Sequence, residues 1–137
     1  MALCTEELVR AFIACTLPKN EWTHHAHLRV GLWHLLEHSA EEALALLRDR
    51  IQRYNVSCGT ANTDQSGYHE TITCFYVRLI SQFLRSVDRS RGIDHLAEEL
   101  IRRYGDKNLP LQYYSRERLF SVLSRRDWVE PDLAPLE

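Results

Sequence analysis

The sequence predicts an all-α fold, a compact bundle of about five to six helices in a single domain over residues 1–137. Apolar residues recur at steps of three and four almost throughout, and no stretch alternates apolar and polar residues for long enough to form a strand. Cap-forming and helix-ending residues stand between these patterns. With 45% hydrophobic residues, the chain can fill one core without disulfides or a structural metal.

The first three helices are predicted from the residues at their ends. Thr5 opens a short first helix, which Pro18 closes. A second helix is capped by Thr23 and runs to about His38. The segment Ser39-Ala-Glu-Glu forms a capping box for a third helix, which ends at 58–59. Its apolar stripe consists of Ala43, Leu46, Leu47, Ile51 and Tyr54.

The second half of the chain begins with a polar stretch, 59–67, whose turn-forming residues predict a loop. A fourth helix with a broad apolar face is expected over about 68–87, and a fifth over 93–104 is followed by a glycine. Ser115 is expected to cap one last helix that ends near residue 125. The proline-containing tail, 127–137, is expected to be extended.

Composition and charge exclude several classes of function. The net charge is −2, from 17 Lys and Arg against 19 Asp and Glu, which argues against binding to nucleic acid. No apolar run is long enough for a membrane span or a secretory signal, and the four cysteines lack metal-site spacing, so we expect a cytoplasmic protein with reduced thiols. The glycine-rich loops that hold nucleotides are absent, and no nucleotide cofactor is expected.

A cluster of histidines indicates where chemistry takes place. Five of the seven histidines lie in the segment 24–38. His24 and His27 share one face of the predicted second helix, about 5–6 Å apart at Cβ. His69, at the start of the fourth helix, is the candidate third ligand if the two helices pack together. Three imidazoles would bind a divalent metal, Zn²⁺ or Fe²⁺, and leave one position for water or a small-molecule substrate.

Residues next to His69 supply the candidate catalytic groups. Glu70 is expected to act as a general base or to orient a metal ligand. Thr73 lies one turn after His69 on the same face. Tyr68 and Tyr76 are expected to line the pocket as hydrogen-bond donors or to serve as core aromatics. The sequence therefore predicts a metal-dependent enzyme that acts on a small organic molecule.

Several alternatives stay open at this point. The same histidines and Glu70 would also suit a metal-free acid–base enzyme of the isomerase, dehydratase or cyclase type, or the chain is a non-catalytic binding or accessory protein. His34 and His38 stand near a helix end, where they would complement the helix dipole. Ser115 and the tail either close over a pocket or simply cap a helix and pack on the bundle. The oligomeric state is left open.

Four segments resemble those of a family of small bacterial proteins of unassigned function: W-T-H-H-A-H-L-R-V, G-Y-H-E-T-I-T, Y-Y-S-R-E-R-L-F-S and S-R-R-D-W-V-E-P-D-L-A-P-L. The resemblance covers nearly the whole chain. The residues that match the family pattern are His24, His27, His69, Glu70, Thr71, Tyr114, Ser115 and Asp132. In architecture alone, the expected bundle is similar to three-histidine metal-binding bundles of the DinB-like type, whose H-x-x-x-H pair is missing from the fourth helix here.

Overall fold

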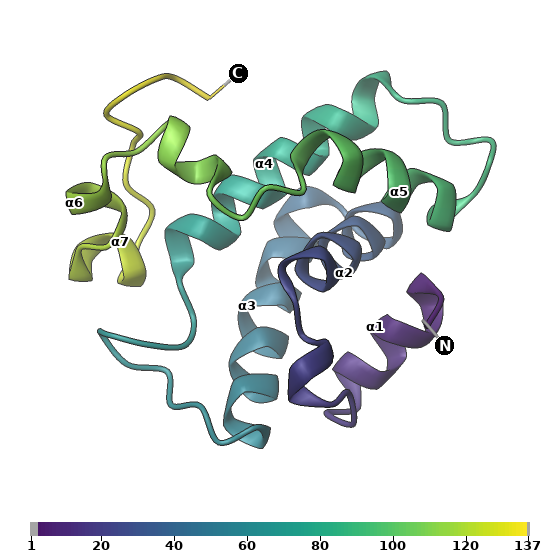
Figure 1. Ribbon diagram of the computed structural model, residues 1–137, viewed down its shortest axis with the longest axis horizontal. Helices are drawn as coiled ribbons and strands as arrows, with labels where there is room; N and C mark the ends of the chain where they lie inside the picture. Colours follow the sequence, from purple (N-terminus) through teal and green to yellow (C-terminus); the bar gives the residue numbers. More distant parts are fainter. Residues whose placement is uncertain (1–2, 137) are drawn as a thin grey trace.

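The fold is organised around helix α2 (His24–Glu37), which lies in the middle of the molecule (Figure 1). Four helices pack against it: α1 (Thr5–Ile13), α3 (Ala40–Ser57), α4 (Glu70–Ser86) and α5 (Ile93–Tyr104). The computed structural model describes residues 3–136, so residues 1, 2 and 137 of the predicted domain lie outside it. Within the described range the all-α single domain is confirmed.

Short elements complete the chain. They are two 3₁₀ turns, Lys19–Glu21 and Leu109–Gln112, and two short helices, α6 (Arg116–Leu119) and α7 (Val122–Arg126). Figure 1 shows α6 and α7 beside the start of α4, away from α1 and α5. Among the helices of residues 3–136, none has the length and apolarity that a membrane crossing needs.

Local capping chemistry sets the starts of the central helices, as predicted. The Thr23 hydroxyl accepts the N–H of Ala26 at 3.2 Å and starts α2. At α3 the Ser39 hydroxyl accepts the N–H of Glu42 at 3.1 Å, while the Glu42 carboxylate accepts the Ser39 N–H at 3.2 Å. These bonds satisfy backbone donors that the first helical turn leaves free. Both predicted caps are confirmed.

The structure differs from the predicted helix bounds at three places. The last helix is split, because the Ser121 hydroxyl accepts the N–H of Ser124 at 3.1 Å and starts a new helix there. The first helix ends at Ile13, well before Pro18, since Cys15 adopts a left-handed φ of 60° that breaks the helix. The fourth begins at Glu70, because His69 is its cap.

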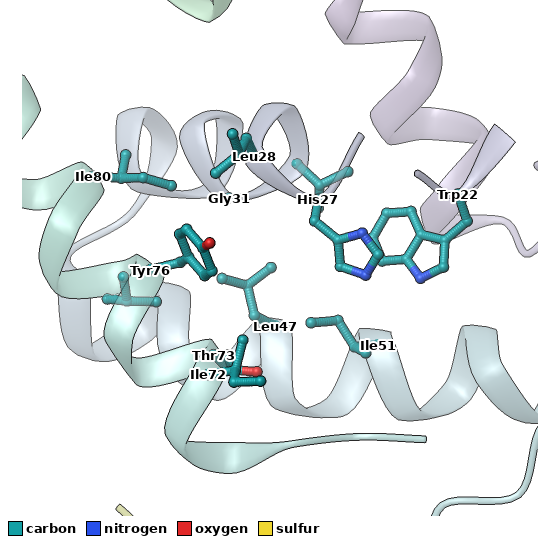
Figure 2. Close-up of a pocket in the computed structure, with 12 residues that line it drawn as sticks. Trp22, His27, Leu28, Gly31, Leu47, Ile51, Ile72, Thr73, Tyr76 and Ile80 are labelled. Carbon is teal, nitrogen blue, oxygen red and sulfur yellow. The ribbon is translucent and has the colours of Figure 1, made fainter. Parts of the chain in front are cut away.

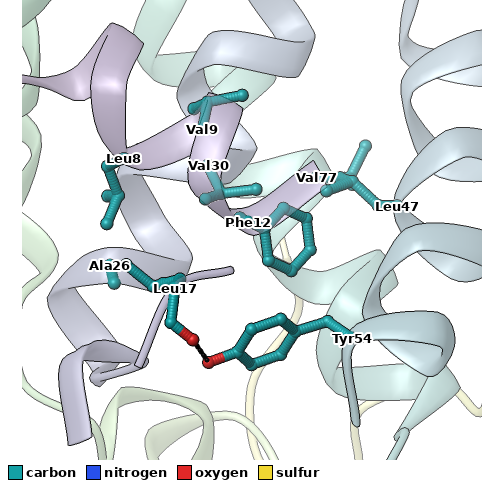
Figure 3. Packing of buried hydrophobic residues seen from close by; sticks show 9 residues of the cluster. All are labelled: Leu8, Val9, Phe12, Leu17, Ala26, Val30, Leu47, Tyr54 and Val77. Carbon is teal, nitrogen blue, oxygen red and sulfur yellow. Dashed lines mark hydrogen bonds between the residues drawn. The ribbon is translucent and has the colours of Figure 1, made fainter. Parts of the chain in front are cut away.

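One part of the core fills the space between α1, α2, α3 and α4 (Figure 3). Phe12 of α1 and Tyr54 of α3 are fully buried there, and Phe12 stacks on Trp22 with ring centroids 4.6 Å apart. The Tyr54 hydroxyl donates to the Leu17 carbonyl at 2.8 Å, which is drawn in Figure 3. This bond lets a polar atom sit inside the core without an unsatisfied donor.

The extended tail is bonded to the bundle. The Val129 N–H donates to the Thr71 hydroxyl at 3.2 Å, and the buried Tyr114 hydroxyl donates to the Val129 carbonyl at 2.7 Å. Ser115 caps α6, as predicted, and its hydroxyl donates to Asp132 at 2.7 Å. Thr71, Tyr114, Ser115 and Asp132 therefore hold the tail in place.

Candidate functional site

Helices α3 and α4 contribute to the lining of two hollows. The first, which we call the apolar cavity, has a volume of about 60 Å³ and is lined mostly by apolar side chains of α2, α3 and α4 (Figure 2). The second, the polar cleft, has a volume of about 370 Å³ and is lined by α3, the loop 58–69 and α7. Adjacent residues of α3 divide between them: Leu47 and Ile51 line the cavity, Arg48 and Gln52 the cleft.

His27 is the histidine whose side chain lines the apolar cavity. Its Nδ1 lies 2.7 Å from the Thr23 carbonyl oxygen. Because a carbonyl oxygen only accepts, Nδ1 carries the proton and Nε2 presents its lone pair. Nε2 has no hydrogen-bond partner within residues 3–136. The ring stacks on Trp22 with centroids 3.8 Å apart, and in Figure 2 this pair lies at the end of the cavity opposite Tyr76.

The surroundings of His27 keep its ring neutral. Burial lowers the pKa of His27 to about 4, the hydrogen bond to Thr23 opposes this shift, and the nearby His24 adds to it. The residue is nevertheless exposed to solvent: many protein atoms surround the ring, but it lines a hollow that is open to the surface. Nε2 is therefore an unprotonated acceptor at neutral pH.

Two further polar groups lie on the cavity wall. The Thr73 hydroxyl donates to the His69 carbonyl at 2.9 Å and keeps its lone pairs free for a second bond. The Tyr76 hydroxyl is buried and has no partner in the described part of the chain. The same is true of His24 Nε2, and the His24 ring meets Tyr76 edge-on with centroids 5.4 Å apart. Burial lowers the pKa of His24.

In the polar cleft, both carboxylate oxygens of Glu70 accept hydrogen bonds. Its carboxylate accepts from Arg48 Nε at 3.0 Å and Nη2 at 2.6 Å, and from the Tyr68 hydroxyl at 2.7 Å. Cys74 contributes a longer contact from its sulfur at 3.4 Å. Burial alone would raise the pKa of Glu70, but the bonds from Arg48, Tyr68 and Cys74 outweigh it and hold that pKa below its usual value. Glu70 is thus a fixed anion that orients Arg48.

Arginines of α7 tie the loop 58–69 to the cleft. Arg126 binds Asp64 through two bonds of 2.7 and 2.6 Å, and Arg125 donates to the carbonyls of Gly67 and Tyr68 at 3.1 and 3.2 Å. Gly67 has a φ of 80°, and a Cβ there would lie 2.6 Å from the Ala61 carbonyl, so this position requires glycine.

His69 has no nitrogen left for a ligand. As the cap of α4, its Nδ1 accepts the N–H of Ile72 at 3.2 Å. Its Nε2 lies 2.8 Å from the buried Leu119 carbonyl and donates to it. Burial lowers the pKa of His69, so the ring stays neutral with both nitrogens occupied. The imidazole therefore joins α4 to α6.

The structure separates the residues predicted for the site. His27 and Thr73 line the apolar cavity, whereas Tyr68 and Glu70 line the polar cleft. His24 lies beside Tyr76 and also borders a separate surface hollow. Over residues 3–136, no three or more His, Cys, Asp or Glu side chains are grouped so as to hold a metal ion. A metal bound by His24, His27 and His69 stays a prediction.

Sequence patterns do not indicate Trp22 or Arg48 as site residues. The position of Trp22 just before the histidine cluster is the only feature of the sequence that points to it. Arg48 reaches Glu70 only through the packing of α3 on α4. The helix-dipole interpretation does not fit His34, which is fully buried and accepts a bond from Arg50 at 2.8 Å. A neutral imidazole does not complement a helix dipole.

Comparisons with known proteins do not identify the site. No protein-family model, curated protein or solved structure matches the chain. The resemblance to a family of small bacterial proteins therefore stays a prediction, and the function has to be argued from the two hollows.

Proposed function

We propose that this chain is an acid–base enzyme that binds a small organic molecule in the apolar cavity and uses His27 Nε2 to accept a proton from it. One observation carries the proposal. His27 lines the cavity, and its Nε2 has no hydrogen-bond partner among residues 3–136. A polar group that lines a cavity and that the protein does not satisfy is a natural contact for a ligand.

The contacts around His27 fit the requirements for a general base. Such a base needs a second group that fixes the tautomer and orientation of its ring, and the Thr23 carbonyl supplies this through Nδ1. The stack on Trp22 holds the plane of the ring. Thr23 is the cap of α2 and His27 lies near the start of that helix, so Nε2 sits on a helix rather than on a loop.

The chemistry is a proton transfer within one bound molecule. Nε2 takes a proton from a C–H or O–H group, and the electron pair of that bond stays on the substrate. The resulting imidazolium is stabilised by the Thr23 carbonyl and returns its proton to a different atom. Isomerisation, dehydration and cyclisation all follow this course, and only dehydration releases a further product, water.

Hydrogen exchange tests the proposal across many compounds at once. The protein is incubated in D₂O with a panel of small carbonyl and hydroxy compounds, and loss of C–H signals is followed by proton NMR. We expect at least one compound to exchange faster with the wild type, and His27→Gln to slow that exchange by about 10²-fold or more. His25→Gln is the control and should exchange like the wild type, since His25 is exposed like His27 but does not line the apolar cavity.

Two results would contradict the proposal. In one, no compound of the panel exchanges faster with protein than without it. In the other, His27→Gln exchanges as fast as the wild type.

A bound metal is the second candidate. His24 and His27 both carry an Nε2 without a protein partner in the described residues, and the Thr23 carbonyl already orients His27 as it would a metal ligand. His69 would have to give up its bonds to Ile72 and Leu119 to join them. Metal analysis of tag-free protein distinguishes the candidates: about one ion per chain, lost in His24→Ala and His27→Ala, would favour the metal.

We also propose a cytoplasmic location. All four cysteines are free thiols, from exposed Cys4 to buried Cys74. Free thiols on a protein are typical of a reducing compartment. Fractionation of the producing cells would test it.

A further inference from the structure

We infer that the ligand is a small amphiphilic carboxylate, with its apolar body in the apolar cavity and its carboxylate bound by Arg48 in the polar cleft. The inference rests on the proposed function in one respect, since both place the ligand in the apolar cavity. It goes further in naming the class of the ligand and a second binding residue.

The two hollows are placed to hold the two ends of one molecule. On α3 the cavity residues Leu47 and Ile51 are each followed by a cleft residue, Arg48 and Gln52. Both hollows therefore border α3, on faces that differ by the roughly 100° between successive helical residues. A ligand that spans both would run between α3 and α4, which contribute to the lining of each.

Polar groups of the two hollows also come close together. The Tyr68 hydroxyl, in the cleft, donates to Glu70 at 2.7 Å. Burial raises the pKa of Tyr68, and the nearby side chain of Thr73, which lines the cavity, opposes that rise. A ligand at the boundary would find hydroxyl groups on one side and apolar side chains on the other.

The cleft is lined by three arginines and three carboxylates, so its charges balance in number: Arg48, Arg125 and Arg126 against Asp64, Glu70 and Asp127. Exposure differs within the ion pair of Arg48 and Glu70, whose side chains are 44% and 12% exposed, so the guanidinium faces the solvent and the carboxylate is largely covered. At the second ion pair both side chains are exposed, Arg126 at 64% and Asp64 at 36%. An anionic group is therefore favoured beside Arg48, which Glu70 holds in place.

Arg48 keeps donors for such a group. Glu70 occupies Nε and Nη2, which leaves Nη1 without a partner within the range 3–136. Because Glu70 fixes one edge of the guanidinium, the plane of this group is set before a ligand binds. Guanidinium groups held in this way bind planar carboxylates with defined geometry.

The apolar cavity is the smaller of the two hollows, with a volume of about 60 Å³ against about 370 Å³ for the polar cleft. It suits a short alkyl chain or a small branched group better than a long lipid chain.

A titration series tests the inference. The wild type is titrated with linear carboxylates from propanoate to octanoate and with primary alcohols of the same lengths, and dissociation constants are measured by ¹H–¹⁵N NMR. We expect each added methylene to tighten binding about fourfold until the cavity is filled. At equal length, the carboxylate should bind at least tenfold more tightly than the alcohol. This comparison uses the intact wild type and depends on no variant.

Variants then assign the two ends of the ligand. Arg48→Gln should remove the preference for carboxylate and leave the affinity for the alcohols unchanged, while Arg48→Lys should keep part of it. Ile51→Phe, which fills the cavity, should weaken both series at least tenfold. Arg53→Gln is the matched control, an exposed arginine of α3 outside both hollows, and should change neither series.

The contrary results distinguish failure of the inference from failure of the proposed function. If alcohols bind as tightly as carboxylates, or if Arg48→Gln keeps the preference, the inference is wrong and the proposed function stands. If no compound binds up to its solubility limit, the inference is wrong and the cavity loses its support as a ligand site. The exchange experiment with His27→Gln is independent of Arg48, so failure of the proposed chemistry is seen separately.

Discussion

The two ends of helix α2 carry histidines with the same pKa shift and different surroundings. Burial lowers the pKa of His27, near the start, and of His34, near the end, to about 4 in each case. His34 uses both nitrogens: Nδ1 donates to the Val30 carbonyl at 2.8 Å and Nε2 accepts from Arg50 at 2.8 Å. His27 is exposed and uses only Nδ1 among residues 3–136, whereas His34 is fully buried. The same pKa shift therefore accompanies two different environments, and only the hydrogen bonds distinguish them.

The difference comes from the partner helix. Opposite His34, α3 supplies Arg50, whose guanidinium reaches the ring. Opposite His27, α3 supplies Leu47 and Ile51, which have no polar atom to offer. The same residue type is thus satisfied at one end of α2 and left free at the other.

Replacing His34 by alanine should have the largest effect. The change removes two buried hydrogen bonds, leaves Arg50 without its partner and opens a cavity, so we expect a loss of about 3 kcal/mol in unfolding free energy. His27→Ala should cost less than about 1 kcal/mol, because its Nε2 bonds nothing. Urea unfolding measures the loss of unfolding free energy in each variant. Equal losses would contradict the difference drawn between His34 and His27.

Acid should destabilise the fold through His34. The folded-state pKa of about 4 lies below the ordinary value of 6.5, so the unfolded chain binds more protons between these values. The contribution of His34 is fully present above pH 6.5 and falls as the pH is lowered toward 4. Between pH 6.5 and 5 we expect a loss of about 2 kcal/mol from this residue. Urea unfolding at several pH values measures it, and His34→Gln should lack it.

Loss of the His69 cap should have an intermediate effect. His69→Ala removes the cap of α4 and the bond to Leu119, so unfolding free energy should fall by about 1–2 kcal/mol. His69→Asn restores a side chain that caps helices and should recover part of the loss. A variant with wild-type stability would show that these bonds make no net contribution to the stability of the fold.

The smallest effect is expected at Tyr76. Its buried hydroxyl has no partner in the described residues, so Tyr76→Phe removes an unsatisfied polar group and should leave stability unchanged or raise it by about 0.5 kcal/mol. Thermal unfolding with Tyr68→Phe as the matched control measures this, since the Tyr68 hydroxyl bonds Glu70. A loss above about 1 kcal/mol would mean that Tyr76 has a partner in solution.

Sequence patterns predicted the fold well, because caps are local. Thr23, Ser39 and Ser115 each bond a backbone N–H three residues ahead, which a sequence displays directly. The split of the last helix was missed although Ser121 forms the same bond, because the apolar pattern runs on through it.

The site was predicted less completely, because it depends on contacts between distant residues. Tyr68 and Glu70 lie close together in the chain, and their bond is a short-range one. In contrast, the Leu119 carbonyl that occupies His69 is 50 residues away, and Arg48 reaches Glu70 across 22. No local pattern encodes such contacts. Whether a histidine is satisfied is therefore decided only when the helices pack.

The nitrogen NMR spectrum of the histidine side chains tests most directly whether His27 Nε2 is free and faces a ligand. At neutral pH we predict that Nε2 of His27 carries no proton and that its signal moves when a short-chain carboxylate is added, while the signals of His34 stay in place. A proton on Nε2 of His27, or a His27 signal that does not move in the presence of a bound carboxylate, would contradict this account.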